Sequence, residues 1–369
     1  MILSLNLHSQ VKFLTSYIMD ENTSNSGMSR YTDVSKFPFS LPYVSNPDGI
    51  PNEDYHNAEK FSAFISSTGL KQYKTSPLWF KYAVENNAGD ISKEAQVMGN
   101  GYHDYLASIA NCKSDKLFMD AYAIFEEPVN PKTNKPYGMD TAKYAEAEEQ
   151  AKADSQGKIP ISKASLKTIQ EMVNHLQYGS KENSSDIRML LRHGRAERSY
   201  FCEYEGAYFK FRTDLSTSKK IIDWKTVAVD DLHMDTIIKI INNYGYDISA
   251  AFYQFFNHII TGRWKEFYWV FQQKSPPYDF VIVNSAPFTY EFAYETINNK
   301  RQKIVTETNV GARKFHALLE QHIHCVENNY WPGAAIFIPE GTFGVTKGKR
   351  IMECELPPYH RKEITFYNT

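Results

Sequence analysis

The sequence predicts an α/β fold, in which a central mixed sheet is flanked by helices and preceded by an N-terminal helical elaboration. Residues 66–193 contain several stretches with helical periodicity, and some of them begin with a residue that caps helices well. From about residue 197, aromatic and polar residues alternate with a period of two, which is typical of half-buried strands. Helix and strand patterns then follow one another to residue 328 without an internal repeat or a linker-like stretch, which favours one domain.

The first residues are expected to form an arm. Residues 20–29 are polar and rich in turn formers, and residues 37–52 are rich in Pro, Ser and Asn. We therefore divide the chain into a flexible N-terminal arm, residues 1–44, and a single domain, residues 45–369. The expected parts of this domain are a helical part over residues 45–195, a sheet core over residues 196–285 and C-terminal helices over residues 286–369.

Helices are expected before the sheet wherever apolar residues recur at helical spacing. Ser66 and Ser92 are suitable N-cap residues for a first helical hairpin. A later stretch rich in Ala, Glu and Lys has the charged face of a surface helix, and the Pro- and Asn-containing residues 128–138 should turn. The predicted helices of this part cover residues 66–82, 92–110, 140–154, 162–178 and 184–193.

Strands are expected where the two-residue alternation begins. Glu205-Gly206 stands between two alternating stretches and predicts a hairpin, and a Ser-Pro-Pro turn separates two later stretches rich in aromatic and branched residues. The predicted strands cover residues 199–204, 207–212, 219–226, 266–273 and 279–284. The predicted helices of this half cover residues 231–241, 247–261, 288–301 and 305–328.

The composition excludes some classes of protein. The 369 residues include 41 Lys and Arg and 43 Asp and Glu, so the net charge is −2. This balance rules out a protein that coats nucleic acid through an overall basic surface, although it allows one basic cleft. The chain is 42% hydrophobic, so it can bury a full core, and its four scattered cysteines give no support for disulfides or for a clustered zinc or iron–sulfur site.

The sequence pattern also argues against export and membrane insertion. The apolar residues 1–7 lack a basic start and are soon followed by His8, Gln10 and Lys12, unlike a secretory signal. No run of about 18 apolar residues occurs, as a spanning helix would need. We therefore expect a reduced, cytoplasmic protein without a membrane partner.

Two carboxylates and a lysine form the sharpest chemical pattern. Asp214 follows the second strand of the predicted hairpin, and Asp223 and Lys225 are two residues apart on the next strand, so they point to one face. Neighbouring strands would bring the three side chains together. Such a set suits phosphodiester hydrolysis, because carboxylates hold Mg²⁺ or Mn²⁺, which stabilises charge on a phosphate and activates water, while a lysine orients or deprotonates that water.

The alternative is an ordinary surface pair, since an Asp-x-Lys triplet is common. Asp223, however, follows Ile221 and Ile222 on a strand that is predicted to be buried, where a carboxylate is costly unless it is paired or coordinated. Asp214 also occurs at a suitable distance on the preceding strand. Both observations favour a site.

The order strand–Asp, turn, strand–Asp-x-Lys resembles the PD-(D/E)xK nuclease superfamily, and further stretches resemble its RecE-type phage exonucleases (exonuclease VIII). The similarity covers about residues 55 to 260, with the motifs in the family's order, and this ordered conjunction is specific although no single motif is. It implies a PD-(D/E)xK restriction-endonuclease-like core. The matching stretches are Tyr55-His56, Ile65-Ser66-Ser67-Thr68-Gly69-Leu70-Lys71 with Ser76-Pro77, Gly99 with His103, Glu197, Lys210-Phe211-Arg212-Thr213-Asp214, Ile221-Ile222-Asp223-Trp224-Lys225-Thr226, and Tyr246 with Tyr253-Gln254.

The resemblance implies roles for individual residues. The catalytic residues would be Lys225, Asp214, Asp223 and Glu197, and the metal ligands would be His103, Glu197, Asp214 and Asp223. The DNA-binding or site-ordering residues would be Arg212, Thr226, Ser249, Tyr253, Gln254, Ser66 and Lys71.

Two positions depart from the family's pattern. Thr213 replaces its usual Pro, which should alter only the local turn. Ser249 replaces its usual Gln, although Gln254 follows five residues later, and this puts the role of that helix in doubt.

Structural alternatives exist for two of the implied ligands. A lone histidine on an apolar helix, such as His103, is usually a packed residue, and a lone glutamate such as Glu197 is usually a surface charge. The match of Gly99 and His103 to the family's Gly-x-x-x-His favours a metal ligand. The place of Glu197 just before the hairpin favours a ligand or a carboxylate next to the ligands. A histidine among carboxylates suits Mn²⁺ at least as well as Mg²⁺.

As a function, the resemblance implies a metal-dependent exodeoxyribonuclease that degrades one strand of linear double-stranded DNA from the 5′ end and leaves 3′ single strands for phage recombination. It further implies a ring-shaped homo-oligomer, a single-strand annealing protein as a partner and the cytosol of a bacterial host. Two alternatives stay open. One is a CRISPR-associated-type or endonucleolytic nuclease of the same superfamily, although the missing four-cysteine cluster argues against its iron–sulfur members. The other is a catalytically idle DNA-binding phage protein, which Ser249 supports weakly and the Asp214, Asp223 and Lys225 set opposes.

Overall fold

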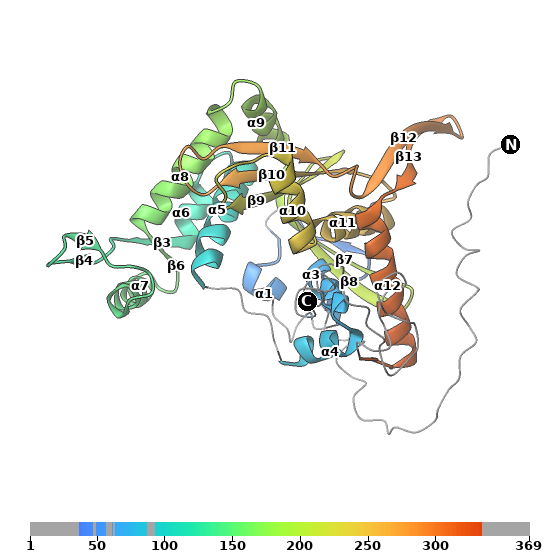
Figure 1. Cartoon of the computed structure of the whole chain (residues 1–369), viewed down its shortest axis with the longest axis horizontal. Coiled ribbons are helices and arrows are strands. Elements are labelled where there is room, and N and C mark those ends of the chain that lie inside the picture. Colours follow the sequence, from blue (N-terminus) through green and yellow to red (C-terminus); the bar gives the residue numbers. More distant parts are fainter. Residues whose placement is uncertain (1–36, 47–48, 57–60, 62, 87–92, 334–369) are drawn as a thin grey trace, which may run out of the picture.

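A seven-stranded mixed sheet forms the centre of the computed structural model, which describes residues 37–46, 49–56, 61, 63–86 and 93–333 (Figure 1). Its strands are β1 (Tyr43–Val44), β2 (Phe64–Ile65), β7 (Arg195–Tyr204), β8 (Ala207–Ser216), β9 (Lys220–Val227), β10 (Glu266–Gln273) and β11 (Phe280–Asn284). The order is β1-β7-β8-β9-β10-β11, with β2 paired to β8. The pairs β9–β10 and β2–β8 are parallel and the others antiparallel, which confirms the predicted mixed sheet.

Helices cover both faces of this sheet. They are α1 (Asn52–His56), α3 (Ser67–Lys71), α4 (Pro77–Asn86), α5 (Lys93–Cys112), α6 (Lys116–Ala121), α7 (Ala142–Asp154), α8 (Lys163–Tyr178), α9 (Asn183–His193), α10 (Met234–Tyr244), α11 (Tyr246–Thr261) and α12 (Val310–Asn328). Trp224 of β9 packs in a core with α5, α8 and α9, whereas its near neighbour Ile221 packs on the opposite face with α10 and α11. A further core joins β7 and β8 to α3, α11 and α12. The predicted α/β fold is therefore confirmed.

Helices α5 and α8 approach each other closely at Gly101. A Cβ atom on Gly101 would lie 2.9 Å from Cδ1 of Ile169 on α8, which is too close for a real side chain. His103 follows two residues later on α5. The position of His103 over the sheet therefore depends on how tightly these two helices pack.

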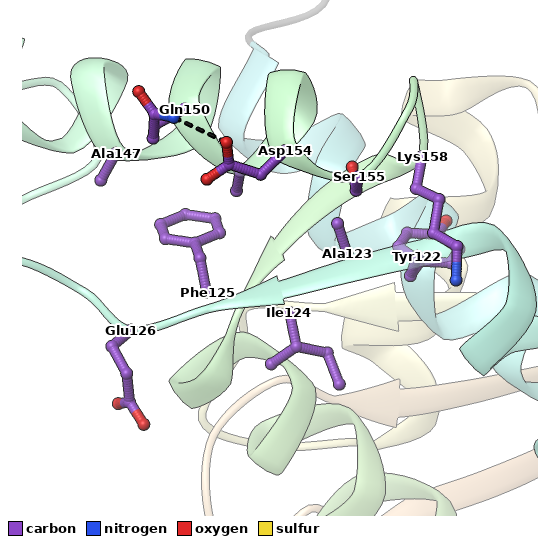
Figure 2. A pocket seen from close by; sticks show the side chains of 11 residues that line it. Tyr122, Ala123, Ile124, Phe125, Glu126, Ala147, Gln150, Asp154, Ser155 and Lys158 are labelled. Carbon is purple, nitrogen blue, oxygen red and sulfur yellow. Dashed lines mark hydrogen bonds between the residues drawn. The ribbon is translucent and has the colours of Figure 1, made fainter.

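A small module projects from the body at the side of α8 (Figure 1). It consists of the parallel pair β3 (Tyr122–Phe125) and β6 (Ile159–Ser162), the hairpin of β4 (Val129–Asn130) and β5 (Lys135–Pro136), and α7. The hairpin accounts for the turn expected at residues 128–138. A pocket lies between β3 and α7, with Phe125 and Asp154 in its lining (Figure 2), and it contains none of the predicted site residues.

The prediction of a helix over residues 288–301 is wrong. The strands β12 (Tyr290–Ile297) and β13 (Lys300–Thr308) occupy this region and pair antiparallel. The turn between them is formed by Asn298 and Asn299, with φ values of 50° and 60°. Asparagine tolerates positive φ better than most residues do, and two such residues suit the turn of a tight hairpin. Because β13 extends to Thr308, α12 begins at Val310 and not at the predicted residue 305.

The helix predicted over residues 66–82 is divided. It forms α3, a 3₁₀ turn (Gln72–Lys74) and α4, which begins at Pro77. Proline has no N–H to donate to the preceding turn but fits the first position of a helix, so it separates the two helices.

Part of the predicted arm belongs to the sheet. Tyr43 pairs with Phe201 and Val44 with Tyr200. Residues 1–36 of the predicted arm and residues 334–369 at the C-terminal end of the predicted domain lie outside the described residues. Within the described ranges, no helix combines the length and the apolar character that crossing a membrane requires.

Candidate metal centre

Strands β8 and β9 separate at the two carboxylates that the sequence singles out. Leu215 pairs with Ile222 and Ser216 with Ile221, and along these two strands the pairing stops there. Asp214 and Asp223 would form the next pair. The backbone N–H of Trp224 donates to Oδ2 of Asp214 at 2.8 Å, so a side-chain oxygen replaces a hydrogen bond of the ladder. Asp214 and Asp223 thus lie where the regular pairing of the two strands has ended.

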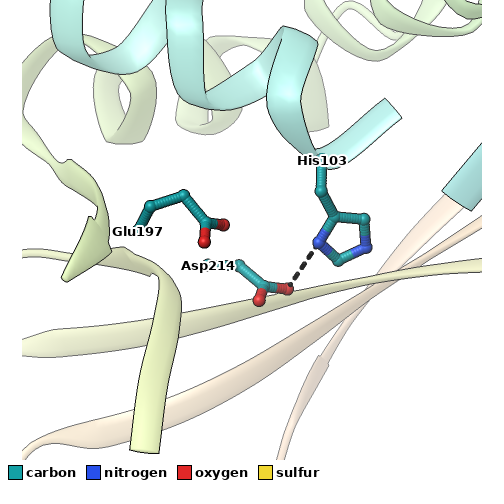
Figure 3. Close-up of side chains that lie close together, drawn as sticks. All are labelled: His103, Glu197 and Asp214. Carbon is teal, nitrogen blue, oxygen red and sulfur yellow. Dashed lines mark ion pairs between the residues drawn. The ribbon is translucent and has the colours of Figure 1, made fainter. Parts of the chain in front are cut away.

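Three potential metal ligands converge at this opening from three elements. They are His103 of α5, Glu197 of β7 and Asp214 of β8, whose ligand atoms all lie within 4.8 Å of one another (Figure 3). Nδ1 of His103 lies 3.3 Å from Oδ2 of Asp214. The side chains of His103 and Asp214 are 27% and 16% exposed, so both are partly shielded from water and still accessible.

Glu197 reaches this centre through an unusual backbone conformation. Its φ is +55°, in the left-handed region, although it lies within a strand. The residues on either side stay in register, with Ala196 opposite Leu215 and Arg198 opposite Thr213. The strand is therefore interrupted at Glu197 alone. Strain of this kind is kept only where the surroundings enforce it, and it is frequent at functional sites.

Asp223 and Lys225 form an ion pair next to these three residues. The Lys225 ammonium lies 2.6 Å from Oδ2 of Asp223 and 4.9 Å from the ring centroid of Tyr246, at the start of α11. The ion pair is consistent with the expected common face of β9. Asp223 is not one of the three converging ligands, but its charge acts on the same centre, because Asp214 and His103 both contribute to its pKa.

The pKa values of the three carboxylates at the centre are not all shifted in the same direction. Burial, and after it the charge of Asp214, raises the pKa of Glu197 to about 8. Burial likewise raises the pKa of Asp223, and Lys225 offsets this only in part. Burial would also raise the pKa of Asp214, but His103, Lys225 and the Trp224 N–H together outweigh it and lower that pKa.

The nearby carboxylates stabilise the charged forms of the two basic groups. Burial lowers the pKa of His103, but the charge of Asp214 and its hydrogen bond outweigh this and raise it. Burial also lowers the pKa of Lys225, but Asp223 and Asp214 outweigh this and raise it. A centre that gathers cations around its carboxylates in this way is one that a divalent cation would also stabilise.

The donor set fits Mg²⁺ or Mn²⁺. Ligand oxygens lie about 2.1 Å from Mg²⁺, so opposite ligands are separated by roughly 4.2 Å. The three ligand atoms, within 4.8 Å of one another, come close to this spacing. One imidazole and two carboxylates form a mixed set that suits Mn²⁺ as well as Mg²⁺.

Of the other predicted site residues, the structure brings three close to the centre. Arg212 lies 3.7 Å from the Glu197 carboxylate. Lys71 shares the Tyr246 ring with Lys225, at 6.0 Å from its centroid. Tyr253 packs on Phe211, with 5.1 Å between the ring centroids. Burial first, and then Tyr55, Asp223 and Asp214, raise the pKa of Tyr253, so its hydroxyl lies within electrostatic reach of the centre.

The remaining four make other contacts. Ser66 caps α3 by accepting from the Gly69 N–H at 3.3 Å. The Ser249 hydroxyl donates to the Gly245 carbonyl at 3.5 Å within its own turn. The Gln254 amide donates to the Lys265 carbonyl at 3.0 Å inside the core. Gln254 therefore does not take the place of the Gln that the family usually has where this chain has Ser249. Thr226 directly follows Lys225 on β9 and so points to the opposite face.

Three residues that were not predicted as site residues, Tyr246, Tyr55 and Lys210, also lie beside residues of the centre. Tyr246 lies against Lys225, while Tyr55 lies under both Arg212, at 4.2 Å, and Lys210, at 4.8 Å. The signal for Lys210 was available, because it is two residues from Arg212 on a strand and so shares its face. Nothing in the spacing of Tyr55 or Tyr246 indicated these contacts.

The fold and this centre together define the class of protein. A mixed sheet with Asp on one strand and Asp-x-Lys on the next, where the two strands separate, is the arrangement of the PD-(D/E)xK nuclease superfamily. A family model described as a PDDEXK-like domain of unknown function (DUF3799) matches residues 66–314. The match covers more than half of the chain, so the chain belongs to this family.

The other comparisons add little. A search of curated proteins found no match. The crystal structure of a "Putative exonuclease" from Eubacterium rectale is similar, with 16% sequence identity and a TM-score of 0.45, and the match covers 78% of this chain and 91% of that chain. At this level, the likeness transfers neither the activity nor the detailed fold of that protein to this chain.

Proposed function

We propose that this protein is a metal-dependent exodeoxyribonuclease that acts on the ends of linear double-stranded DNA. The observation that carries the proposal is the convergence of His103, Glu197 and Asp214 within 4.8 Å, next to the Asp223–Lys225 ion pair. Membership of a PDDEXK-like family supports phosphodiester hydrolysis at this centre.

The residues present would hold Mg²⁺ or Mn²⁺ through His103, Glu197 and Asp214, with Asp223 beside them. When bound, such an ion supplies charge stabilisation on a phosphate and a more acidic water molecule. Glu197 and His103 must lose their protons to act as ligands, so both residues make the centre sensitive to pH.

Lys225 is suited to charge stabilisation. Its ammonium is fixed by Asp223 at 2.6 Å and by the Tyr246 ring at 4.9 Å, and the charges of Asp223 and Asp214 raise its pKa. A protonated lysine cannot accept a proton from water, but it can stabilise the extra negative charge on a phosphate in the transition state. We therefore assign Lys225 to transition-state stabilisation and positioning, and not to the role of general base.

Lys71 offers a second cation to the nucleic-acid backbone. Its ammonium donates to the Tyr244 carbonyl at 3.1 Å, and no carboxylate of the described residues lies within ion-pair distance of it. Burial, and after it the charge of Lys225, lowers the pKa of Lys71 to about 8. A phosphate placed between the two lysines would relieve their repulsion, so Lys71 is suited to the phosphate next to the scissile one.

The ordered motifs shared with RecE-type exonucleases support a finer version of the proposal. In it, hydrolysis proceeds from the 5′ end and leaves 3′ single strands for phage recombination in the cytosol of a bacterial host. A ring-shaped homo-oligomer and a single-strand annealing protein as partner are further parts of this version.

One experiment separates the proposal from its alternatives. Linear DNA, labelled at the 5′ or the 3′ end, and closed circular DNA are incubated with Mg²⁺, Mn²⁺ or EDTA, with the Asp214→Asn variant as the inactive control. We expect metal-dependent loss of linear DNA only, with the 5′ label released first. Cleavage of circles would indicate an endonuclease, and binding without cleavage would indicate an idle DNA-binding protein.

A further inference from the structure

Arg212 connects several parts of the protein next to the metal centre. Its Nη1 lies 3.7 Å from Oε2 of Glu197, its Nε donates to Oγ of Ser199 at 2.9 Å, and its Nη2 donates to the Ile50 carbonyl at 2.6 Å. Its guanidinium lies over the ring of Tyr55, at 4.2 Å from the centroid. All three of its nitrogens are thus directed at protein groups, and the side chain is only 10% exposed. Little of it remains available to a ligand.

Two of these partners belong to an N-terminal strap, which we define as residues 43–46 and 49–56. Ser45 of the strap exchanges two hydrogen bonds with Ser199, one from each backbone N–H, and both are 2.9 Å long. Further along, Lys210 donates to the Tyr55 carbonyl at 2.8 Å. The strap is therefore attached to β7 at Ser199, which pairs with Arg212, and to β8 at Lys210, and it holds the Ile50 carbonyl and the Tyr55 ring in place.

Glu197 is the member of the metal centre that needs such support. Its left-handed φ of +55° is unfavourable for a residue with a side chain, and relaxation to an extended strand would redirect its carboxylate. The strap also packs against the Glu197 backbone, since a Cβ on Gly49 would lie 3.4 Å from the Glu197 carbonyl oxygen. Arg212 and the strap thus act on the side chain and on the backbone of the same strained residue.

We propose that Arg212 is a positioning residue: anchored by the strap, it holds the Glu197 carboxylate at the metal centre and does not bind DNA. The inference rests on the proposed function for the identity of the metal centre. It differs from a purely electrostatic role, because a cation beside a ligand should repel a divalent metal, whereas a cation that orients the ligand should favour metal binding. When the charge of Arg212 is removed, the electrostatic role predicts tighter metal binding and the positioning role predicts weaker metal binding.

The test measures Mn²⁺ binding directly, by calorimetry without DNA, in the wild type and in the variants Arg212→Gln and Arg212→Lys. We expect Arg212→Gln to bind Mn²⁺ about 10- to 100-fold more weakly, as is usual when a group that orients a ligand is lost. Arg212→Lys keeps the charge but cannot contact Glu197, Ser199 and Ile50 together, so we also expect weaker binding. The affinity for DNA, measured without a divalent metal, should change less than about threefold.

Lys220→Gln is the matched control. It also removes one positive charge from the central sheet, but the Lys220 ammonium lies over the Tyr268 ring, at 4.7 Å from its centroid, and takes no part in holding the strap or Glu197. Its Mn²⁺ affinity should remain within about threefold of wild type. Should Arg212→Gln fail to fold, Ser199→Ala removes only the acceptor of Nε, and it should still weaken Mn²⁺ binding several-fold.

The outcomes separate this inference from the proposed function. Unchanged or tighter Mn²⁺ binding by Arg212→Gln, or a loss of DNA affinity without a loss of Mn²⁺ affinity, would overturn the positioning role. A wild type that binds no Mn²⁺ would overturn both this inference and the metal centre. A wild type that binds Mn²⁺ but leaves DNA intact would overturn only the nuclease function, and the comparison of the variants would still decide the role of Arg212.

Discussion

The Trp224 backbone N–H donates to Oδ2 of Asp214 at 2.8 Å, so the residue between Asp223 and Lys225 holds the carboxylate of the neighbouring strand. The contact accompanies the end of regular pairing between β8 and β9. It fixes Asp214 relative to the Asp-x-Lys segment even though the two strands separate. Changes at Asp223, Lys225, Glu197 and Lys71 therefore test different parts of one connected centre.

Asp223→Ala should reduce cleavage at least about 100-fold, which corresponds to roughly 2.7 kcal/mol in the barrier. The reason is the loss of a carboxylate beside the three ligands and of the partner that orients Lys225 at 2.6 Å. Initial rates on linear DNA at saturating Mn²⁺ measure the effect. Glu266→Gln is the control. Glu266 begins β10, away from the centre, and its carboxylate pairs with Lys303 of β13. Retention of more than a tenth of the wild-type rate would contradict a role for Asp223 in the site.

Lys225→Ala should lower kcat by a few orders of magnitude, on the order of 3–5 kcal/mol, with nearly unchanged Mn²⁺ affinity. Lys225→Arg should restore activity only in part, because the larger guanidinium does not fit between Asp223 and the Tyr246 ring in the same way. Single-turnover rates and a Mn²⁺ titration separate the two effects. Normal kcat with weakened Mn²⁺ binding would mean that Lys225 supports the metal and not the transition state.

Metal-free protein should lose stability as the pH rises from about 4.5 to 8. Glu197 keeps its proton to about pH 8 in the folded state, whereas an unfolded glutamate releases it near 4.5. The folded state therefore binds more protons within this window, and its stability falls by on the order of a few kcal/mol as the window is crossed. The raised pKa of His103 acts in the same direction.

The addition of Mn²⁺ should reverse this trend, because binding requires the deprotonated ligands. We expect a larger increase of Tm on adding Mn²⁺ at pH 8.5 than at pH 6. Glu197→Gln should flatten the pH dependence of the metal-free protein. An equally steep dependence in Glu197→Gln would show that another group titrates in this range.

Lys71→Gln should lower kcat/KM by about tenfold, roughly 1.4 kcal/mol, if the ammonium contacts a backbone phosphate. The test pairs this variant with DNA that carries a neutral methylphosphonate at the phosphate next to the scissile one. In wild type, the modified DNA should be cleaved more slowly, and in Lys71→Gln the penalty should disappear. If the full penalty persisted in the variant, that phosphate would have another partner.

The sequence predicted those parts of the fold that depend on a local pattern. Alternating residues gave the strands around Glu205-Gly206, and Asp223 and Lys225 lie on one face of β9 because a strand has a period of two. The prediction of a helix over residues 288–301 was wrong because the aromatic and branched residues of this stretch also fit strands. The deciding feature was the ability of Asn298 and Asn299 to adopt positive φ.

The site was less accessible to sequence reasoning where it depends on long-range contacts. The left-handed conformation of Glu197 follows no local rule, since its neighbours are those of an ordinary strand. Gln254 matched the family's pattern only nominally, because its helix directs it into the core toward Lys265. The contacts of Arg212 with Ile50 and Tyr55 join residues more than 150 positions apart, and no spacing could have indicated them.

The close approach of α5 and α8 at Gly101 makes the helical layer and the sheet mutually dependent. A chimaera that retained every strand carboxylate but took its helices from a relative would lose the ligand from α5 unless the new helices packed equally closely. A methyl group at position 101 would lie 2.9 Å from Cδ1 of Ile169, so either the Ile169 side chain or α5 would have to move. The helices before the sheet thus supply part of the centre, because a sheet core without α5 would lack one of its three converging ligands.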